Sequence, residues 1–116
     1  MAAPRDDYWS DRLESVLAGL HEDLQSLESE LAATRAIRAN GSDDDEHDPD
    51  GVPLSSVLQL LEGQRMRTLD QAREAEIALV DLGQGRFGIC RKCSQRIPPS
   101  RLEIKPTTRT CVKCAA

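Results

Sequence analysis

The chain has 116 residues and a formal net charge of -5, and it contains one Trp, one Tyr and one Phe. This length suits one small domain, but so few bulky side chains exclude a large aromatic core. No run of about 18 apolar residues is present to cross a membrane, and the start of the chain lacks the basic and then apolar layout of a secretory signal. The sequence therefore predicts a cytoplasmic protein without a membrane segment.

Leucines in the first third of the chain are spaced alternately four and three residues apart. The stripe consists of Leu13, Leu17, Leu20, Leu24, Leu27 and Leu31. This spacing is typical of a coiled-coil seam. Good helix formers continue to Ala39, and Asn40-Gly41 supplies a stop. We therefore predict a first helix from Asp7 to Ala39.

An acidic segment follows this helix. Six carboxylates occupy positions 43–50 within the stretch SDDDEHDPDG. The segment from about residue 40 to 53 contains Gly and Pro, which predict a loop. From the sequence alone, the loop is either a solvated spacer or a group of charges held out for a function.

The four-and-three spacing resumes after the acidic loop and predicts a second helix from Leu54 to Leu82. Its stripe consists of Leu54, Leu58, Leu61, Arg65, Thr68, Ala72, Ala75, Leu79 and Leu82. Each stripe is too narrow for a conventional core, so we expect the two helices to bury their seams against each other. The result is a monomeric, antiparallel coiled-coil hairpin, a rod about 40 Å long with the acidic loop at its tip. A parallel homodimer is the alternative for such heptads.

Four cysteines near the end of the chain form two CxxC pairs. Cys90 and Cys93 make the first pair, Cys111 and Cys114 make the second, and 17 residues lie between the pairs. Zn²⁺ takes four ligands in a tetrahedron, and two such turns supply four thiolates with no vacancy for water. We therefore predict one structural zinc ion in a small ribbon of short strands and turns. Two disulfides or a redox CxxC are the rival interpretations, against which a cytosolic chain and the duplicated CxxC argue.

The charge is divided between two parts of the chain. Residues 1–85 carry 7 Lys or Arg and 19 Asp or Glu, whereas residues 86–116 carry 8 and 1. We therefore expect two domains, the mainly α hairpin at 1–85 and a small four-cysteine zinc-ribbon module at 86–116. We expect the basic module to present a partner-binding face that includes Arg91, Lys92, Arg96 and Arg101.

The hairpin with an acidic tip, followed by FGICRKC, RIPPSRLEIKP and CVKC, resembles the DksA/TraR family of bacterial zinc-finger transcription regulators. One position departs from the family's zinc motif, because Ser94 replaces the usual Gly after the second cysteine. The residues in register with that motif are Phe87, Gly88, Cys90, Cys93, Ile97, Arg101, Leu102, Pro106, Cys111 and Cys114.

The resemblance implies direct binding to RNA polymerase, with the zinc module at the rim of the secondary channel and the acidic tip near the catalytic centre. Sequence-specific DNA binding is not expected. The family's tip motif is Asp-x-x-Asp-x-Ala, to which Asp45 and Asp48 correspond, while Asp50 stands where Ala is expected. Carboxylates there can perturb a Mg²⁺-dependent centre, since Mg²⁺ takes oxygen ligands.

The sequence offers less support for two other classes of function. A zinc-ribbon adaptor would bind nucleic acid or another protein through the basic module, although Phe87 alone interleaves these charges, which gives base stacking little support. An enzyme is not expected, because no Ser/His/Asp set and no glycine-rich phosphate loop accompany the acidic segment.

Overall fold

The computed structural model describes residues 4–40 and 53–115. It contains the helices α1 (Pro4–Asn40), α2 (Leu54–Gly83) and α3 (Pro99–Ile104). The predicted mainly helical fold is confirmed, and the two long helices extend slightly beyond the predicted ranges. The acidic loop, including Asp45 and Asp48, lies outside the described residues. No described helix has the length and apolar content needed to span a membrane.

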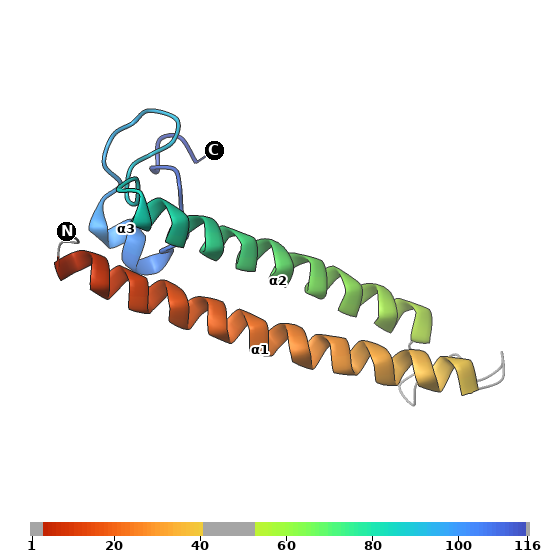
Figure 1. Cartoon of the computed structure of the whole chain (residues 1–116). Helices are drawn as coiled ribbons and strands as arrows, with labels where there is room; N and C mark the ends of the chain where they lie inside the picture. Colours follow the sequence, from red (N-terminus) through yellow and green to blue (C-terminus); the bar gives the residue numbers. More distant parts are fainter. Residues whose placement is uncertain (1–3, 41–52, 116) are drawn as a thin grey trace. The chain divides into compact units, whose positions relative to one another are not determined.

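The chain forms two compact units, and both long helices contribute a segment to each unit. Unit 1 comprises Met1–Gly19 and Gln71–Ala116, and unit 2 comprises Leu20–Asp70. Within each unit the segments of α1 and α2 lie side by side (Figure 1). The boundary predicted between residues 85 and 86 stays a prediction. Unit 1 includes both the four-cysteine module and the ends of the two long helices.

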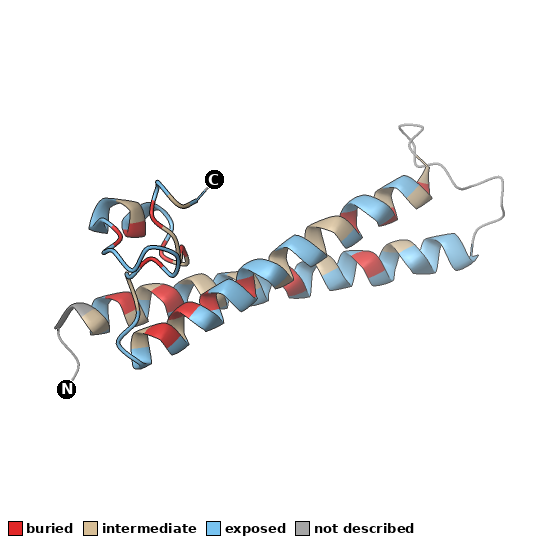
Figure 2. Ribbon diagram, turned by 90° about the horizontal axis from the view of Figure 1, so that it is seen from above, coloured by how far each residue is buried: buried red, intermediate tan, exposed pale blue. Residues whose placement is uncertain are grey.

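Unit 2 buries leucines of the predicted seam between its two helical segments. Leu31 of α1 packs with Leu58 and Leu61 of α2, and Leu27 and Val57 lie against this cluster. Buried positions recur at intervals along each helix, as expected for a narrow seam (Figure 2). Contacts between the two helices of one chain favour the hairpin over the parallel dimer.

A polar seam residue in unit 2 is accommodated by a bond to its own helix. The Thr68 hydroxyl donates to the Gln64 carbonyl at 2.9 Å, so the half-buried side chain has a partner.

On the surface, Arg35 Nη2 lies 2.7 Å from Glu62 Oε1 across the two helices. Both side chains are more than half exposed, so this ion pair contributes at most about 1 kcal/mol.

The helical part of unit 1 is packed around small side chains. Leu13 of α1 and Ala75 of α2 are completely buried, and Ala72 and Ala78 are nearly so. Alanines at these positions let the α2 backbone approach its neighbours closely. Unit 1 therefore combines large α1 side chains with a small-residue face of α2.

The end of α2 is fixed by a Schellman motif at Gly85. Gly85 has a φ of +74°, the Arg86 N–H donates to the Asp81 carbonyl at 2.8 Å, and the Gly85 N–H donates to the Leu82 carbonyl at 3.3 Å. An ion pair joins the same two outer residues, with Arg86 Nη2 3.2 Å from Asp81 Oδ1. This turn directs the chain from α2 into the four-cysteine module.

The two glycines at this turn provide a matched pair of tests. Gly85→Ala is expected to lower the free energy of unfolding by about 1 kcal/mol, because an L side chain is strained at positive φ. Gly83→Ala is the control, since Gly83 is helical and its added Cβ would meet nothing within 4 Å. It is expected to leave stability unchanged or raise it. Denaturant unfolding of the zinc-loaded protein measures both, and equal stability of the two variants would contradict the prediction.

The predicted short strands are not found in the described part of the four-cysteine module. Only an isolated antiparallel bridge joins Ile89 and Arg96. A short helix, α3, lies between the two CxxC pairs, where the ribbon of short strands and turns was predicted. The reason is that Pro98 has extended backbone angles and Pro99 occupies the start of the helix, where a missing N–H costs nothing. The helix places Leu102 in the core.

Candidate metal centre

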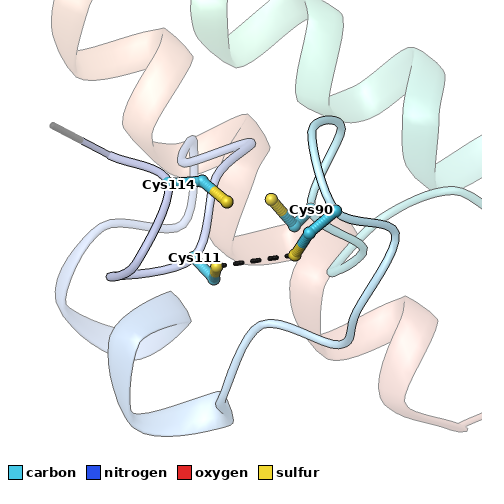
Figure 3. A group of neighbouring side chains, drawn as sticks. Cys90, Cys111 and Cys114 are labelled. Carbon is cyan, nitrogen blue, oxygen red and sulfur yellow. Dashed lines mark hydrogen bonds between the residues drawn. The ribbon is translucent and has the colours of Figure 1, made fainter.

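The four cysteine sulfurs converge in unit 1. Their Sγ atoms all lie within 4.8 Å of one another. The labelled side chains of Cys90, Cys111 and Cys114 point toward a common centre, and a dashed line marks the contact of 3.7 Å between Cys93 Sγ and Cys111 Sγ (Figure 3). All four cysteines are free thiols. The predicted pairing of the two CxxC turns is thus present in the structure.

The separation of the sulfurs fits a tetrahedral zinc site. Zn–S bonds of about 2.3 Å place the sulfurs of a tetrahedron about 3.8 Å apart. The distance of 3.7 Å between Cys93 and Cys111 agrees with this geometry. Four soft sulfur donors suit Zn²⁺ and fill its coordination shell, so the arrangement supports one structural ion rather than a catalytic one.

Backbone hydrogen bonds shape the first CxxC turn. The Cys90 N–H donates to the Gln95 carbonyl and the Ser94 N–H donates to the Cys90 carbonyl, both at 2.8 Å. This closed turn requires a left-handed residue, and Ser94 has a φ of +62°. A non-glycine residue in this conformation costs roughly 1–2 kcal/mol. The departure from glycine noted in the sequence therefore carries a cost in stability.

The second CxxC turn is tied to α3 and to the first turn. The Cys114 N–H donates to the Cys111 carbonyl at 3.1 Å, and Arg101 Nε donates to the Thr110 carbonyl at 3.0 Å. The Arg91 N–H donates to the Arg109 carbonyl at 2.9 Å, which links the two halves of the module. These bonds hold the two pairs of sulfurs facing each other.

The metal centre shares its core with the start of α1. Cys90 and Cys111 are buried with Trp9, Ile97 and Leu102, while the half-buried Leu82, Phe87 and Cys114 pack against them. The ring centroids of Trp9 and Phe87 lie 5.4 Å apart, and those of Tyr8 and Trp9 lie 4.9 Å apart. All the aromatic residues of the chain therefore gather in unit 1.

Polar contacts from α1 to Glu103 accompany this packing. The Tyr8 hydroxyl donates to the Glu103 carboxylate, at 2.8 Å from Oε1 and 2.9 Å from Oε2. The bond to Glu103 raises the pKa of Tyr8 above its ordinary value. Arg12 donates to the Glu103 backbone carbonyl through Nη2, and its Nη1 lies 3.8 Å from Oε2. These contacts join residues more than 90 positions apart, and no local pattern in the sequence predicts them.

Asp81 anchors the end of α2 to the module. Its carboxylate is nearly buried and accepts from Arg86 Nη2 at 3.2 Å and from Arg109 Nε at 3.0 Å. A buried carboxylate needs such partners, because removal from water is costly when the charge is unpaired. Asp81 was not singled out in the sequence, where it is one acid among many in the second helix.

The thiols differ in acidity before any metal binds. Backbone N–H groups, first that of Cys111 and then that of Cys93, lower the pKa of Cys90 to about 6. The neighbouring thiol of Cys111, followed by burial, raises the pKa of Cys114 to about 12. At neutral pH the metal-free cluster therefore holds Cys90 mainly as thiolate and Cys114 as thiol.

The basic residues chosen from the sequence fall into two groups. Arg91 and Arg96 are exposed, and no hydrogen bond or ion pair of their side chains is found in the described residues. Lys92 Nζ donates to the Cys114 carbonyl at 3.2 Å, and half-buried Arg101 binds Thr110. These two side chains thus have partners within the module. Their role in partner binding remains a prediction.

Residues 85–116 match the family model described as "Prokaryotic dksA/traR C4-type zinc finger". The chain carries a DksA/TraR zinc finger. The resemblance seen in the sequence is confirmed over this segment, and so is the expected structural zinc ion. The segment matched by the family model contains both CxxC pairs and α3.

Two known proteins are similar to parts of the chain. An uncharacterized protein of Aquifex aeolicus (strain VF5) is 46% identical over 43 residues, which is 37% of this chain and 30% of that protein. The structure of transcription factor DksA2 from Pseudomonas aeruginosa is similar to this chain, with a TM-score of 0.77 and 21% sequence identity. The matched region covers 93% of this chain and 78% of the DksA2 chain. The latter likeness shows that the fold of this zinc-finger protein is DksA-like.

Removal of zinc is expected to release Trp9 from the core. The module has few apolar side chains, and zinc supplies on the order of 10 kcal/mol of apparent folding free energy in small modules of this kind. Chelation should therefore unfold the module and shift the emission of Trp9, the single tryptophan, to longer wavelength. Added Zn²⁺ should restore the emission and added Mg²⁺ should not. Unchanged emission after metal analysis has shown complete zinc loss would contradict the prediction.

Zinc affinity is expected to fall as the pH falls. Zinc needs thiolates, and the pKa of about 12 means that Cys114 must lose a proton whenever zinc binds near neutral pH. Each proton displaced changes the apparent affinity by about tenfold per pH unit. The pKa of Cys93 is also raised, so Cys93 loses a second proton when zinc binds. Below about pH 6, Cys90 adds a further proton and the dependence steepens. Competition with a chromophoric chelator between pH 5 and pH 8 measures this, and a flat profile would refute it.

Proposed function

We propose that this protein regulates transcription initiation by binding RNA polymerase directly at its secondary channel. The proposal is supported chiefly by one observation, the zinc-finger family match at residues 85–116 within a chain whose fold is DksA-like over 93% of its length. That neighbour is named as a transcription factor. The zinc finger is proposed to hold the enzyme, and the acidic loop is proposed to act on it.

The charge distribution is compatible with this division of roles. The zinc-finger end has an excess of exposed Arg and Lys, which suits an acidic protein surface. The loop between α1 and α2 has six carboxylates and no Lys or Arg between residues 41 and 52. Carboxylates brought near a Mg²⁺-dependent centre compete for the oxygen shell of the metal or for neighbouring cations.

Asp45→Asn/Asp48→Asn is expected to keep polymerase binding and to lose the effect on initiation. The reason is that the two carboxylates stand at the family's tip positions, whereas recognition is assigned to the zinc finger. Asp43→Asn/Asp44→Asn is the matched control, because it removes the same charge from the same loop. The measurements are affinity for core polymerase with zinc-loaded protein and transcript yield from promoters that respond to the unmodified protein.

Each outcome separates one part of the proposal from another. No binding of the zinc-loaded protein at micromolar concentration would overturn the polymerase assignment. Equal loss of the transcriptional effect in both variants would assign it to total loop charge rather than to Asp45 and Asp48. A steeply salt-dependent affinity for DNA, without affinity for polymerase, would instead favour the nucleic-acid adaptor.

A further inference from the structure

A pocket of about 230 Å³ lies within unit 1, between α2 and the four-cysteine module. It is lined by Glu74 and Ile77 of α2, by Arg91, Lys105 and Arg109 of the module, and by threonines at 107, 108 and 110. None of the four cysteines lines it. The pocket is therefore separate from the metal centre.

The cations of the pocket are only partly neutralised. Arg109 is committed through Nε to Asp81 at 3.0 Å. In the described part of the chain, the Arg91 guanidinium and the Lys105 ammonium form no salt bridge, and both residues are exposed. Glu74 contributes one negative charge to the lining. Asp81 is shared between Arg109 and Arg86, so it does not cancel both of their charges. Arg91 and Lys105 together outweigh Glu74. The pocket therefore keeps a net positive charge and suits an anionic group.

The wall that bears these cations is held in place by the module itself. The Thr108 side chain is nearly buried, and its hydroxyl donates to the Thr110 carbonyl at 3.0 Å. The Thr108 N–H donates to the Lys105 carbonyl at 3.1 Å, and the Arg91 N–H donates to the Arg109 carbonyl at 2.9 Å. Backbone positions fixed before binding reduce the entropy that the pocket itself must lose when a group binds.

Size and polarity favour a protein side chain over a free nucleotide. The volume is below the range of about 300–1,000 Å³ that is usual for small-molecule sites. Glu74 would repel the multiple charges of a polyphosphate. Ile77 is 40% exposed in the lining, and Val80, which follows it three residues later on α2, is 54% exposed. These apolar surfaces suit the flanking side chains of a docked protein segment.

We propose that this pocket binds an aspartate or glutamate side chain of the partner protein, with Arg91 and Lys105 as the charged contacts and Ile77 as the apolar one. The partner is RNA polymerase, so this assignment rests on the proposed function. Glu74 acts against the contact and moderates its strength. The basic end of the chain thus has one specific recognition point rather than a general affinity for negative charge.

The test measures the affinity of zinc-loaded full-length variants for core RNA polymerase. Lys105→Glu and Arg91→Glu should each weaken binding by about tenfold, equivalent to about 1.4 kcal/mol. Glu74→Gln should tighten binding, a gain that a folding defect cannot produce. Lys113→Glu is the matched control, because Lys113 is an exposed cation of the same module outside the pocket. Zinc content and Trp9 emission verify that each variant is folded.

The outcomes distinguish this inference from the proposed function. Lack of binding by the unmodified protein would overturn both. Binding that is unchanged in Lys105→Glu and Arg91→Glu, or reduced equally in Lys113→Glu, would overturn the pocket assignment alone. Inorganic pyrophosphate is titrated into the free protein and followed by NMR. If pyrophosphate binds with a submillimolar Kd and the chemical-shift changes centre on Arg91 and Lys105, the assignment of a carboxylate ligand to the pocket is overturned in favour of a phosphate ligand.

Discussion

Four sulfur atoms within 4.8 Å of one another make a core that is stable only with a cation among them. As thiolates they repel each other, and as thiols they offer weak hydrogen bonds in place of strong bonds to metal. A zinc ion converts this repulsion into attraction and holds two turns of the chain together. The packing of Ile97 and Leu102 follows from those turns, and Trp9 packs against the surface that results. The metal therefore determines contacts well beyond its own ligands.

The few bulky side chains of this protein are concentrated beside the metal centre. Tyr8, Trp9 and Phe87 contact one another in series beside the metal centre. Two acidic residues add polar contacts in unit 1. Glu103 accepts hydrogen bonds from Tyr8 and Arg12 of α1. Asp81 of α2 forms ion pairs with Arg86 and Arg109. Unit 2, by comparison, depends on leucines of the narrow seam. The two parts of the hairpin are thus held by different chemistry.

Local patterns in the sequence predicted the elements, while contacts between distant elements were invisible to it. The four-and-three leucine spacing predicted both long helices, since one helical face repeats with that period, and two CxxC pairs predicted the cysteine cluster from ligand number alone. The helix α3 was missed because Pro98-Pro99 reads equally as the end of a strand and the start of a helix. Asp81 and Glu103 were missed because their roles depend on which distant residues face them. The same limit applies to the pocket that joins Glu74 to Lys105.

The contact between Tyr8 and Glu103 spans 95 residues of sequence, which has a consequence for synthesis. A ribosome adds about 5–20 residues per second, so the start of α1 emerges about 5–20 s before its partner in α3 exists. The helical segments of unit 2 meet across a much shorter loop, and their pairing can come first. During this interval Trp9 lacks Ile97 and Leu102, against which it packs in the folded protein. Metal loading needs Cys114, which is synthesised after all three helices, so the core of unit 1 is completed after the helical segments of unit 2 can pair.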